Sequence, residues 1–123
     1  MNGCKNKVIS IGDSFMAFLE SNKKKEFYND IIRIINHYEN GNVAYEKYKK
    51  NSKLHRLDGP AMLIYFKSSK IYKELYYKDD VLHRENGAAE IEYNEQGDII
   101  NKLYYLNGIK YNELEYLLNI ESL

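Results

Sequence analysis

The stretch KLHRLDGPAMLIYF at residues 53–66 recurs 28 positions later as VLHRENGAAEIEYN at residues 81–94. Both copies carry Leu-His-Arg with a glycine three positions after the arginine. Both are followed by matched Ile, Leu and paired Tyr residues, within 71–77 and 99–105. A fixed period of this length is typical of a repeat array, in which a small supersecondary unit packs on its neighbours. The register reaches upstream to residues 41–48 and ends where Tyr111 replaces the histidine. The sequence therefore predicts about two and a half units.

Within each unit the residue pattern is that of antiparallel strands. In 88–94, Ala89, Ile91 and Tyr93 alternate with polar residues, which is the period of two expected when one face of a strand is buried. We therefore expect a mainly β (α+β) fold, an antiparallel β-meander of hairpin repeats. Turn sequences separate the predicted strands, and they lie at 94–98, at Asn107-Gly108, at Asp79-Asp80 and at Asn40-Gly41.

Short helices are expected to cap both ends of the array. Asp13 or Ser14 can N-cap a helix through residues 15–19, and Asn112 with Glu115 forms a capping box before a leucine-rich segment. The stretch 26–38 fits both a helical apolar stripe and, by the repeat register, a strand. We favour a helix that runs into a strand near Ile32. Residues 1–123 then form one domain, with a unique helix-containing segment at 1–37, hairpin repeats at 38–110 and a C-terminal capping helix at 111–123.

The strand expected at 60–66 is apolar on both sides. Met62, Ile64 and Phe66 occupy the positions at which the second unit has Glu90, Glu92 and Asn94, and apolar residues also alternate with them on the opposite side. A strand of this kind requires cover on both faces. A helix around residues 15–19 is the internal cover that we expect. A partner protein is the functional alternative, because an exposed apolar patch marks an interaction site.

The charges of the chain sum to zero but are divided unevenly along it. Residues 1–70 contain 13 Lys and Arg against 7 Asp and Glu (+6), whereas residues 71–123 contain 5 against 11 (−6). Such asymmetry predicts a basic end and an acidic end, each able to steer a charged partner. The alternatives are that the charges cancel in space, or that the acidic face only improves solubility. Together with Met62, Ile64 and Phe66, the candidate partner-binding residues are the carboxylates Glu85, Glu90, Glu92, Glu95 and Asp98. Glu90 and Glu92 alternate with residues expected to be buried, so we expect both to be exposed.

The composition favours a cytoplasmic protein. The single cysteine, Cys4, excludes an intramolecular disulfide and suits a reducing compartment. Apolar runs are only a few residues long, so we expect no membrane span, and residues 1–7 lack the hydrophobic core of a signal peptide.

The unit LHRLDGPAMLIYF resembles the HR-x-DGPA repeats of proteins from large DNA viruses and phages, and through them MORN repeats and MORN-like proteins of the YwqK type. The resemblance covers residues 53–110. Residues 53–61 match the motif, whereas 81–89 depart from it at Asn86 and Ala88. The resemblance implies a β-hairpin repeat fold that serves as a scaffold or docking surface, and it implies no catalytic residue.

The two histidines of the repeat are candidate metal ligands. His55 and His83 share a repeat position, with Asp58 nearby, but the third register position is Tyr111. Zinc and similar ions need three or four converging ligands. We therefore expect no metal, no cofactor and no catalytic residue, and we expect each histidine to fix its own turn by hydrogen bonding. Turn-stabilising ion pairs are expected between Arg56 and Asp58 and between Arg84 and Glu85.

Three functional hypotheses follow from these observations. The first is a non-enzymatic interaction module, encoded by a phage or mobile element, that binds and inhibits a host protein or nucleoprotein complex, as an anti-defence or anti-CRISPR protein does. The second is an antitoxin-like or structural repeat protein that self-associates through sheet edges, for example as a homodimer. The third is a single-stranded nucleic-acid binder, suggested by lysines at 23–25 and 47–53 near tyrosines. The zero net charge disfavours this third hypothesis.

Overall fold

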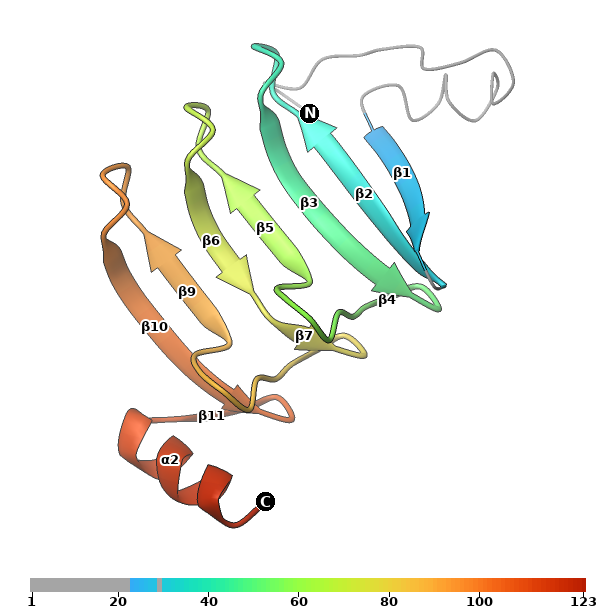
Figure 1. Cartoon of the computed structure of the whole chain (residues 1–123). Coiled ribbons are helices and arrows are strands. Elements are labelled where there is room, and N and C mark those ends of the chain that lie inside the picture. Colours follow the sequence, from blue (N-terminus) through green and yellow to red (C-terminus); the bar gives the residue numbers. More distant parts are fainter. Residues whose placement is uncertain (1–22, 29) are drawn as a thin grey trace.

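The computed structural model describes residues 23–28 and 30–123, and its strands form an antiparallel sheet (Figure 1). Neighbouring strands follow the order β1-β2-β3-β5-β6-β9-β10-β11, β4 pairs with β3, and β7 pairs with β8 separately. The strands are β1 (Lys23–Tyr28), β2 (Ile31–His37), β3 (Val43–Lys50), β4 (Lys53–Leu54), β5 (Met62–Tyr65), β6 (Ile71–Leu75), β7 (Tyr77–Lys78), β8 (Val81–Leu82), β9 (Glu90–Tyr93), β10 (Ile99–Leu106) and β11 (Ile109–Tyr111). The helix α2 (Glu113–Glu121) follows β11. The predicted mainly β, antiparallel class is confirmed.

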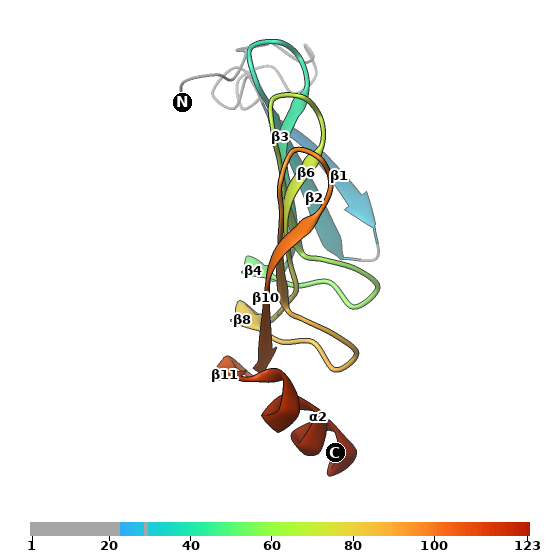
Figure 2. The same cartoon turned by 90° about the vertical axis from the view of Figure 1, so that its left-hand side faces the viewer.

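The sheet is a single layer. Figure 2 shows it edge-on, with loops projecting on one side and α2 at the C-terminal end. In the described part of the chain β7 and β8 pair only with each other and α2 lies at the end of the sheet, and many large side chains of the sheet are half-buried. Among the described residues nine apolar positions are buried, and four of them are alanines, because a thin sheet offers little depth; they are Ile35, Ala44, Ala61, Leu75, Ala88, Ala89, Ile91, Leu106 and Tyr116.

Three hairpins have the same register. Met62 faces Leu75 in β5–β6, Glu90 faces Leu103 in β9–β10, and Ile34 faces Lys47 in β2–β3, each pair 28 positions from the next. The register shift near the upper turn also recurs at the same place in all three hairpins. Tyr65 and Tyr93 consequently occupy equivalent positions in successive hairpins, as the period predicts. Tyr76 and Tyr104 are likewise equivalent, since they pair with residues 83 and 111.

The turns recur with the same period. At the lower end, residues 51–52, 79–80 and 107–108 all have positive φ, which is the backbone of the tight two-residue hairpin turn. Asn107-Gly108 and Asp79-Asp80 are therefore confirmed as hairpin turns. At the upper end, Gly41, Ser69 and Gly97 have φ of 91°, 80° and 89°. The backbone N–H of each donates to the carbonyl three residues before it, which closes the turn. The expected turn at Asn40-Gly41 is thus present.

The N-terminal part of the array differs from our expectation. The helix favoured before Ile32 is wrong: residues 23–28 form β1, which pairs with β2 along its whole length, and Asp30 turns the chain with a φ of 68°. Pairing with β3 on the other side fixes β2 as a strand, so tertiary context overrides the helical stripe. The hairpin β2–β3, which shares the repeated register, accordingly begins at Ile31, upstream of residue 38. The helix expected around Asp13, Ser14 and residues 15–19, which was to cover Met62, Ile64 and Phe66, lies outside the described residues.

The C-terminal helix closes the other end as predicted. The Asn112 side chain accepts the Glu115 backbone N–H at 2.9 Å, and the Glu115 carboxylate accepts the Asn112 N–H at 3.1 Å. On α2, Tyr116 is only 2% exposed, and its ring centre lies 4.9 Å from that of Tyr104. Its hydroxyl donates to the Arg84 carbonyl at 2.7 Å, so the helix is fixed to the loop of the preceding unit.

Candidate interaction surface

The repeated histidines link neighbouring units. His55 Nδ1 accepts the backbone N–H of Asp79 at 3.2 Å, and His83 Nδ1 accepts that of Asn107 at 2.9 Å. Each histidine therefore holds the tight turn of the next hairpin, whereas we expected it to hold its own turn. The described residues contain no cluster of three or more His, Cys, Asp or Glu side chains that could hold a metal ion.

The repeated arginines pack on tyrosines. The Arg56 guanidinium lies 4.0 Å from the ring centre of Tyr48, and Arg84 lies 3.8 Å from that of Tyr76, which is cation–π geometry. The guanidinium groups also donate to the carbonyls of residues 60 and 88. A Cβ on Gly59 would lie 3.0 Å from the Arg56 guanidinium carbon, so glycine at this position leaves room for the arginine. The His-Arg-x-x-Gly motif is thus used in packing the array.

One of the two expected turn ion pairs forms. Arg56 Nε lies 3.0 Å from the Asp58 carboxylate, as predicted. Arg84 instead donates to the side chain of Asn86 at 3.2 Å, and Glu85 accepts from His83 Nε2 at 2.9 Å. The expected Arg84–Glu85 pair is therefore wrong, because Asn86 occupies the position of Asp58 and His83 has a ring nitrogen left over to donate.

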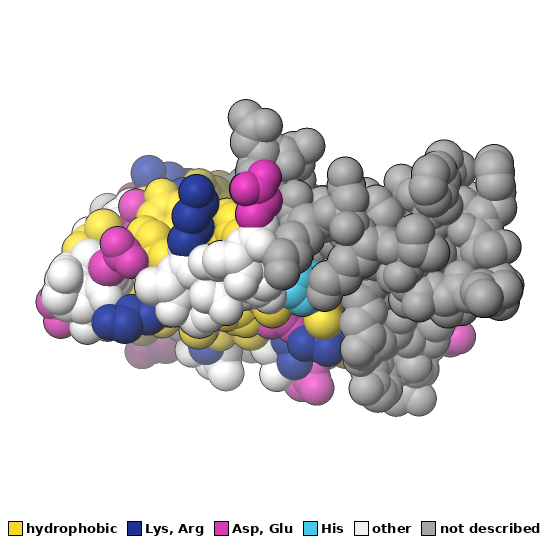
Figure 3. Space-filling view, turned by 90° about the horizontal axis from the view of Figure 1, so that it is seen from above, with side chains coloured by type: hydrophobic (Ala, Val, Ile, Leu, Met, Phe, Trp, Pro, Cys, Tyr) yellow, Lys and Arg dark blue, Asp and Glu magenta, His cyan; other side chains and the backbone are white. Residues whose placement is uncertain are grey.

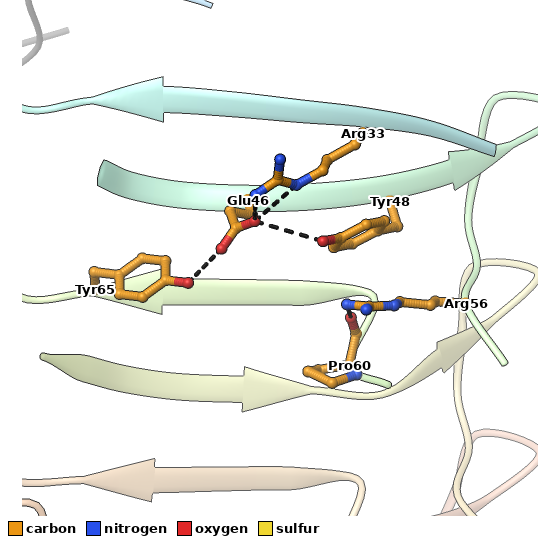
Figure 4. Close-up of polar contacts among 6 residues, drawn as sticks. All are labelled: Arg33, Glu46, Tyr48, Arg56, Pro60 and Tyr65. Atoms are coloured by element: carbon orange, nitrogen blue, oxygen red, sulfur yellow. Dashed lines mark hydrogen bonds and ion pairs between the residues drawn. The ribbon is translucent and has the colours of Figure 1, made fainter. Parts of the chain in front are cut away.

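A tyrosine–carboxylate pair also recurs between hairpins. The Tyr65 hydroxyl donates to Glu46 (Figure 4), and one unit later the Tyr93 hydroxyl donates to Glu74 at 2.9 Å. Glu46 also accepts Arg33 Nε at 2.9 Å. Burial alone would raise the pKa of Glu46, but hydrogen bonds from Tyr65 and Arg33 outweigh it and hold that pKa below its ordinary value. Burial and the bond to Glu74 raise the pKa of Tyr93 to about 12. Neither pair was predicted from the sequence, although the spacing of 19 residues between Glu and Tyr recurs in both units.

The strand pairings divide the sheet into two faces. The Tyr65 face contains the row Ile35, Glu46, Leu63, Glu74, Ile91 and Lys102 together with Tyr65 and Tyr93. The Met62 face contains the rows Ile34, Lys47, Met62, Leu75, Glu90, Leu103 and Asn36, Tyr45, Ile64, Lys73, Glu92, Asn101. Seen from above, hydrophobic side chains gather along the sheet with basic and acidic groups among them (Figure 3).

A groove of about 570 Å³ lies between two successive loops of the array. It is lined by the packed pair Tyr76 and Arg84, by Arg56 and by His83. These side chains already have partners within the array, as described above. The groove therefore lies between side chains that also hold successive units together.

Four of the eight candidate partner-binding residues come together. Met62, Ile64, Glu90 and Glu92 lie in the two rows of the Met62 face, where all four are half-buried. The other four lie elsewhere. Phe66 follows β5 and packs on Tyr72 with ring centres 5.0 Å apart, Glu95 and Asp98 lie in the exposed β9–β10 turn, and Glu85 lies in the loop beside His83.

The exposure that we expected for Glu90 and Glu92 is wrong. Glu90 lies 3.4 Å from Lys73 Nζ, with 17% of its side chain exposed, and Lys73 faces Glu92 directly across β6 and β9. Burial would lower the pKa of Lys73, but the Glu90 carboxylate outweighs it, and the pKa of Lys73 is raised. The segment 79–101 contains no lysine, yet the neighbouring strand supplies one. The acidic patch is therefore partly neutralised.

The ion pair between Glu90 and Lys73 should contribute to the stability of the fold. Replacing Glu90 with lysine should lower the free energy of unfolding by about 1 kcal/mol, because an attraction of ordinary surface-pair size becomes a repulsion against Lys73. The loss should shrink in high salt, where such interactions are screened. Urea denaturation at two salt concentrations measures it. Glu39→Lys is the control, since Glu39 is exposed in a turn and its replacement should change stability little. Equal effects of the two variants would contradict the assignment.

Comparison with known proteins gives no match: no family model, no curated protein and no solved structure is significantly similar to the chain. Within the described residues, no helix is long and apolar enough to cross a bilayer.

Proposed function

We propose that the chain is a non-enzymatic interaction module, a MORN-like array of hairpin repeats that binds a protein through the Met62 face. The motif residues support this proposal because they recur in equivalent roles in successive units. His55 and His83, and likewise Arg56 and Arg84, have the same partners in successive units. A catalytic site needs a constellation that is made once, whereas these residues do the same packing work in each unit.

The observation that carries the proposal is the part of the Met62 face around Met62 and Ile64. Met62 and Ile64 are half-buried, and no described element lies over them. Lys47, Lys73 and Glu90 flank this apolar strip with charges of both signs. Apolar side chains surrounded by polar ones are the usual composition of a protein-binding patch, in which the apolar centre supplies affinity and the charges supply orientation.

The nature of the partner is proposed from the resemblance to repeats of large DNA viruses and phages. A host protein, or a nucleoprotein complex whose activity the module inhibits, fits a small binding protein of this origin. Binding would conceal the strip between Lys47 and Glu90 and would be expected to weaken with salt only modestly, because charges of opposite sign adjoin on this face.

Site-specific photo-crosslinking tests the proposal. A photoreactive amino acid at Ile64 should crosslink a discrete protein in bacterial lysate, whereas the same group at Leu57, which is 79% exposed in a loop, should not. Replacing Met62 with lysine should abolish capture of that protein, while circular dichroism verifies the fold. Crosslinks that are equal at both positions, or capture that survives Met62→Lys, would refute binding through the Met62 face.

A further inference from the structure

The outer edge of β10 is open over half its length. β9 pairs with the inner side of β10 between Ile99 and Leu103, whereas β11 pairs with the outer side only from Tyr104 to Leu106. Nothing in the described part of the chain pairs with the outer side between Ile99 and Leu103. Ile99 and Ile100 are 48% and 56% exposed there.

The preceding units show what belongs at this edge. On the corresponding side of β3, residues 45–47 pair with 62–64, and on β6, residues 73–75 pair with 90–92. One period later, residues 101–103 should receive residues 118–120. Those residues are part of α2, so the helix that closes the array leaves the last strand position empty.

The free edge presents backbone groups that can pair. The Leu103 carbonyl accepts the Ala89 N–H at 2.9 Å, so Leu103 faces inward to β9. The amide groups of successive residues in a regular strand point to opposite sides, so those of Lys102 point outward. The register shift between Ile99 and Asn101 interrupts this alternation at Ile100. An exposed edge of this kind is a template for an added strand.

Lys102 distinguishes this edge from the two before it. It occupies the position of Glu46 and Glu74, which accept the hydroxyls of Tyr65 and Tyr93 from the next strand. Lys102 is exposed, and no hydrogen bond or ion pair within the described residues uses its side chain. The positively charged donor Lys102 therefore stands where the earlier units have a negatively charged acceptor, Glu46 or Glu74. The complementary group on an added strand is a carboxylate in place of the tyrosine.

We propose that the outer edge of β10 binds an extended segment of a protein partner, antiparallel to β10, with an apolar residue opposite Lys102 and an acidic residue two positions after it. The apolar residue corresponds to Leu63 and Ile91, which face Glu46 and Glu74. The acidic residue pairs with the Lys102 ammonium. This edge lies on β10, whereas the side chains proposed to bind a partner, Met62 and Ile64, lie on β5, with β6 and β9 between them. The inference rests on the proposed function only in that the ligand is a protein.

The probe is a synthetic peptide that copies residues 88–94 of β9 with Tyr93→Glu, AAEIEEN, and the comparison peptide is the parent AAEIEYN. Titrated into the isotopically labelled full chain, the glutamate peptide should shift the amide resonances of Ile100 and Lys102. Lys102→Glu should weaken it about tenfold or more, because a hydrogen bond between charged groups is lost, and should favour the parent peptide instead. Lys110→Glu on β11 is the control for charge alone and should leave affinity unchanged.

Lys102→Pro removes the outward N–H without removing a bond to β9, and should abolish binding of both peptides. Unchanged binding to Lys102→Pro or Lys102→Glu, or shifts confined to the Met62 face, would overturn the proposal. Light scattering tests the alternative that a second copy of the chain pairs with this edge. If the free chain is a dimer and Lys102→Pro makes it monomeric, a second copy fills the edge and the proposal is overturned. Because these measurements use purified chain and peptides, their outcome is independent of the crosslinking at Ile64.

Discussion

Replacing Glu46 with alanine is expected to lower the free energy of unfolding by about 3 kcal/mol. The carboxylate accepts from Arg33 and Tyr65, and it lies on β3 between strands of two different hairpins. Its removal leaves a guanidinium and a hydroxyl that are partly buried without their acceptor. Because the Arg33 side chain is 28% exposed, water relieves part of the cost, which places the expected loss at the lower end for a broken ion pair. Chemical denaturation measures it.

The pH dependence separates the charge of Glu46 from its packing. The pKa of Glu46 is lowered in the folded chain, so its carboxylate stabilises the fold above the ordinary pKa of 4.5 and loses this contribution as the pH falls through the folded pKa. The difference in unfolding free energy between wild type and Glu46→Gln should therefore be largest at neutral pH and shrink below pH 4.5. A difference that stays constant with pH would show that the charge contributes nothing.

Replacing Tyr116 with alanine is expected to cost about 3–5 kcal/mol, the usual loss for a buried aromatic side chain. The ring is almost fully buried against Tyr104. It packs on Tyr104 as Arg84 packs on Tyr76, the equivalent tyrosine of the preceding unit. The hydroxyl also accepts the Gly87 N–H at 2.9 Å. The loss should appear both as a lower melting temperature and as the disappearance of the helical signal of α2.

Tyr116→Phe is the matched variant for the hydroxyl. It keeps the ring on Tyr104 and leaves the Arg84 carbonyl and the Gly87 N–H without this partner, so about 1–3 kcal/mol should be lost. Leu117, which is 52% exposed on the same helix, is the control: Leu117→Ala should change stability little. If Leu117→Ala costs as much as Tyr116→Ala, α2 packs in another way.

Sequence periodicity predicted the part of the fold that repeats. The turn residues at 79–80 and 107–108 and the capping box at Asn112 are local signals, and local backbone chemistry determined the outcome at each of them. The strand β1 was not predictable in this way. Residues 23–28 have no counterpart in the later units, and only the pairing of β1 with β2 selects strands over the helix that the apolar spacing of residues 26–38 suggests.

The candidate surface was predicted less well, because charge along a sequence does not show which strands adjoin. Glu90 and Glu92 alternate with buried residues and were expected in solvent, yet Lys73 from the preceding unit lies beside them. The pairing of Glu46 with Tyr65 likewise depends on neighbouring strands. The repeat alignment contains a signal for this pairing, because Glu74 and Tyr93 have the same spacing as Glu46 and Tyr65.

The forward link from each histidine to the next tight turn has a consequence for how such a chain can change in evolution. His55 receives an N–H from the turn at residue 79, and His83 receives one from the turn at 107, so every unit brings both a donor for the unit before it and an acceptor for the unit after it. A recombination event that duplicates or deletes one 28-residue segment would join compatible ends. The length of the array can therefore vary in whole units, while the first strands and the closing helix are inherited unaltered.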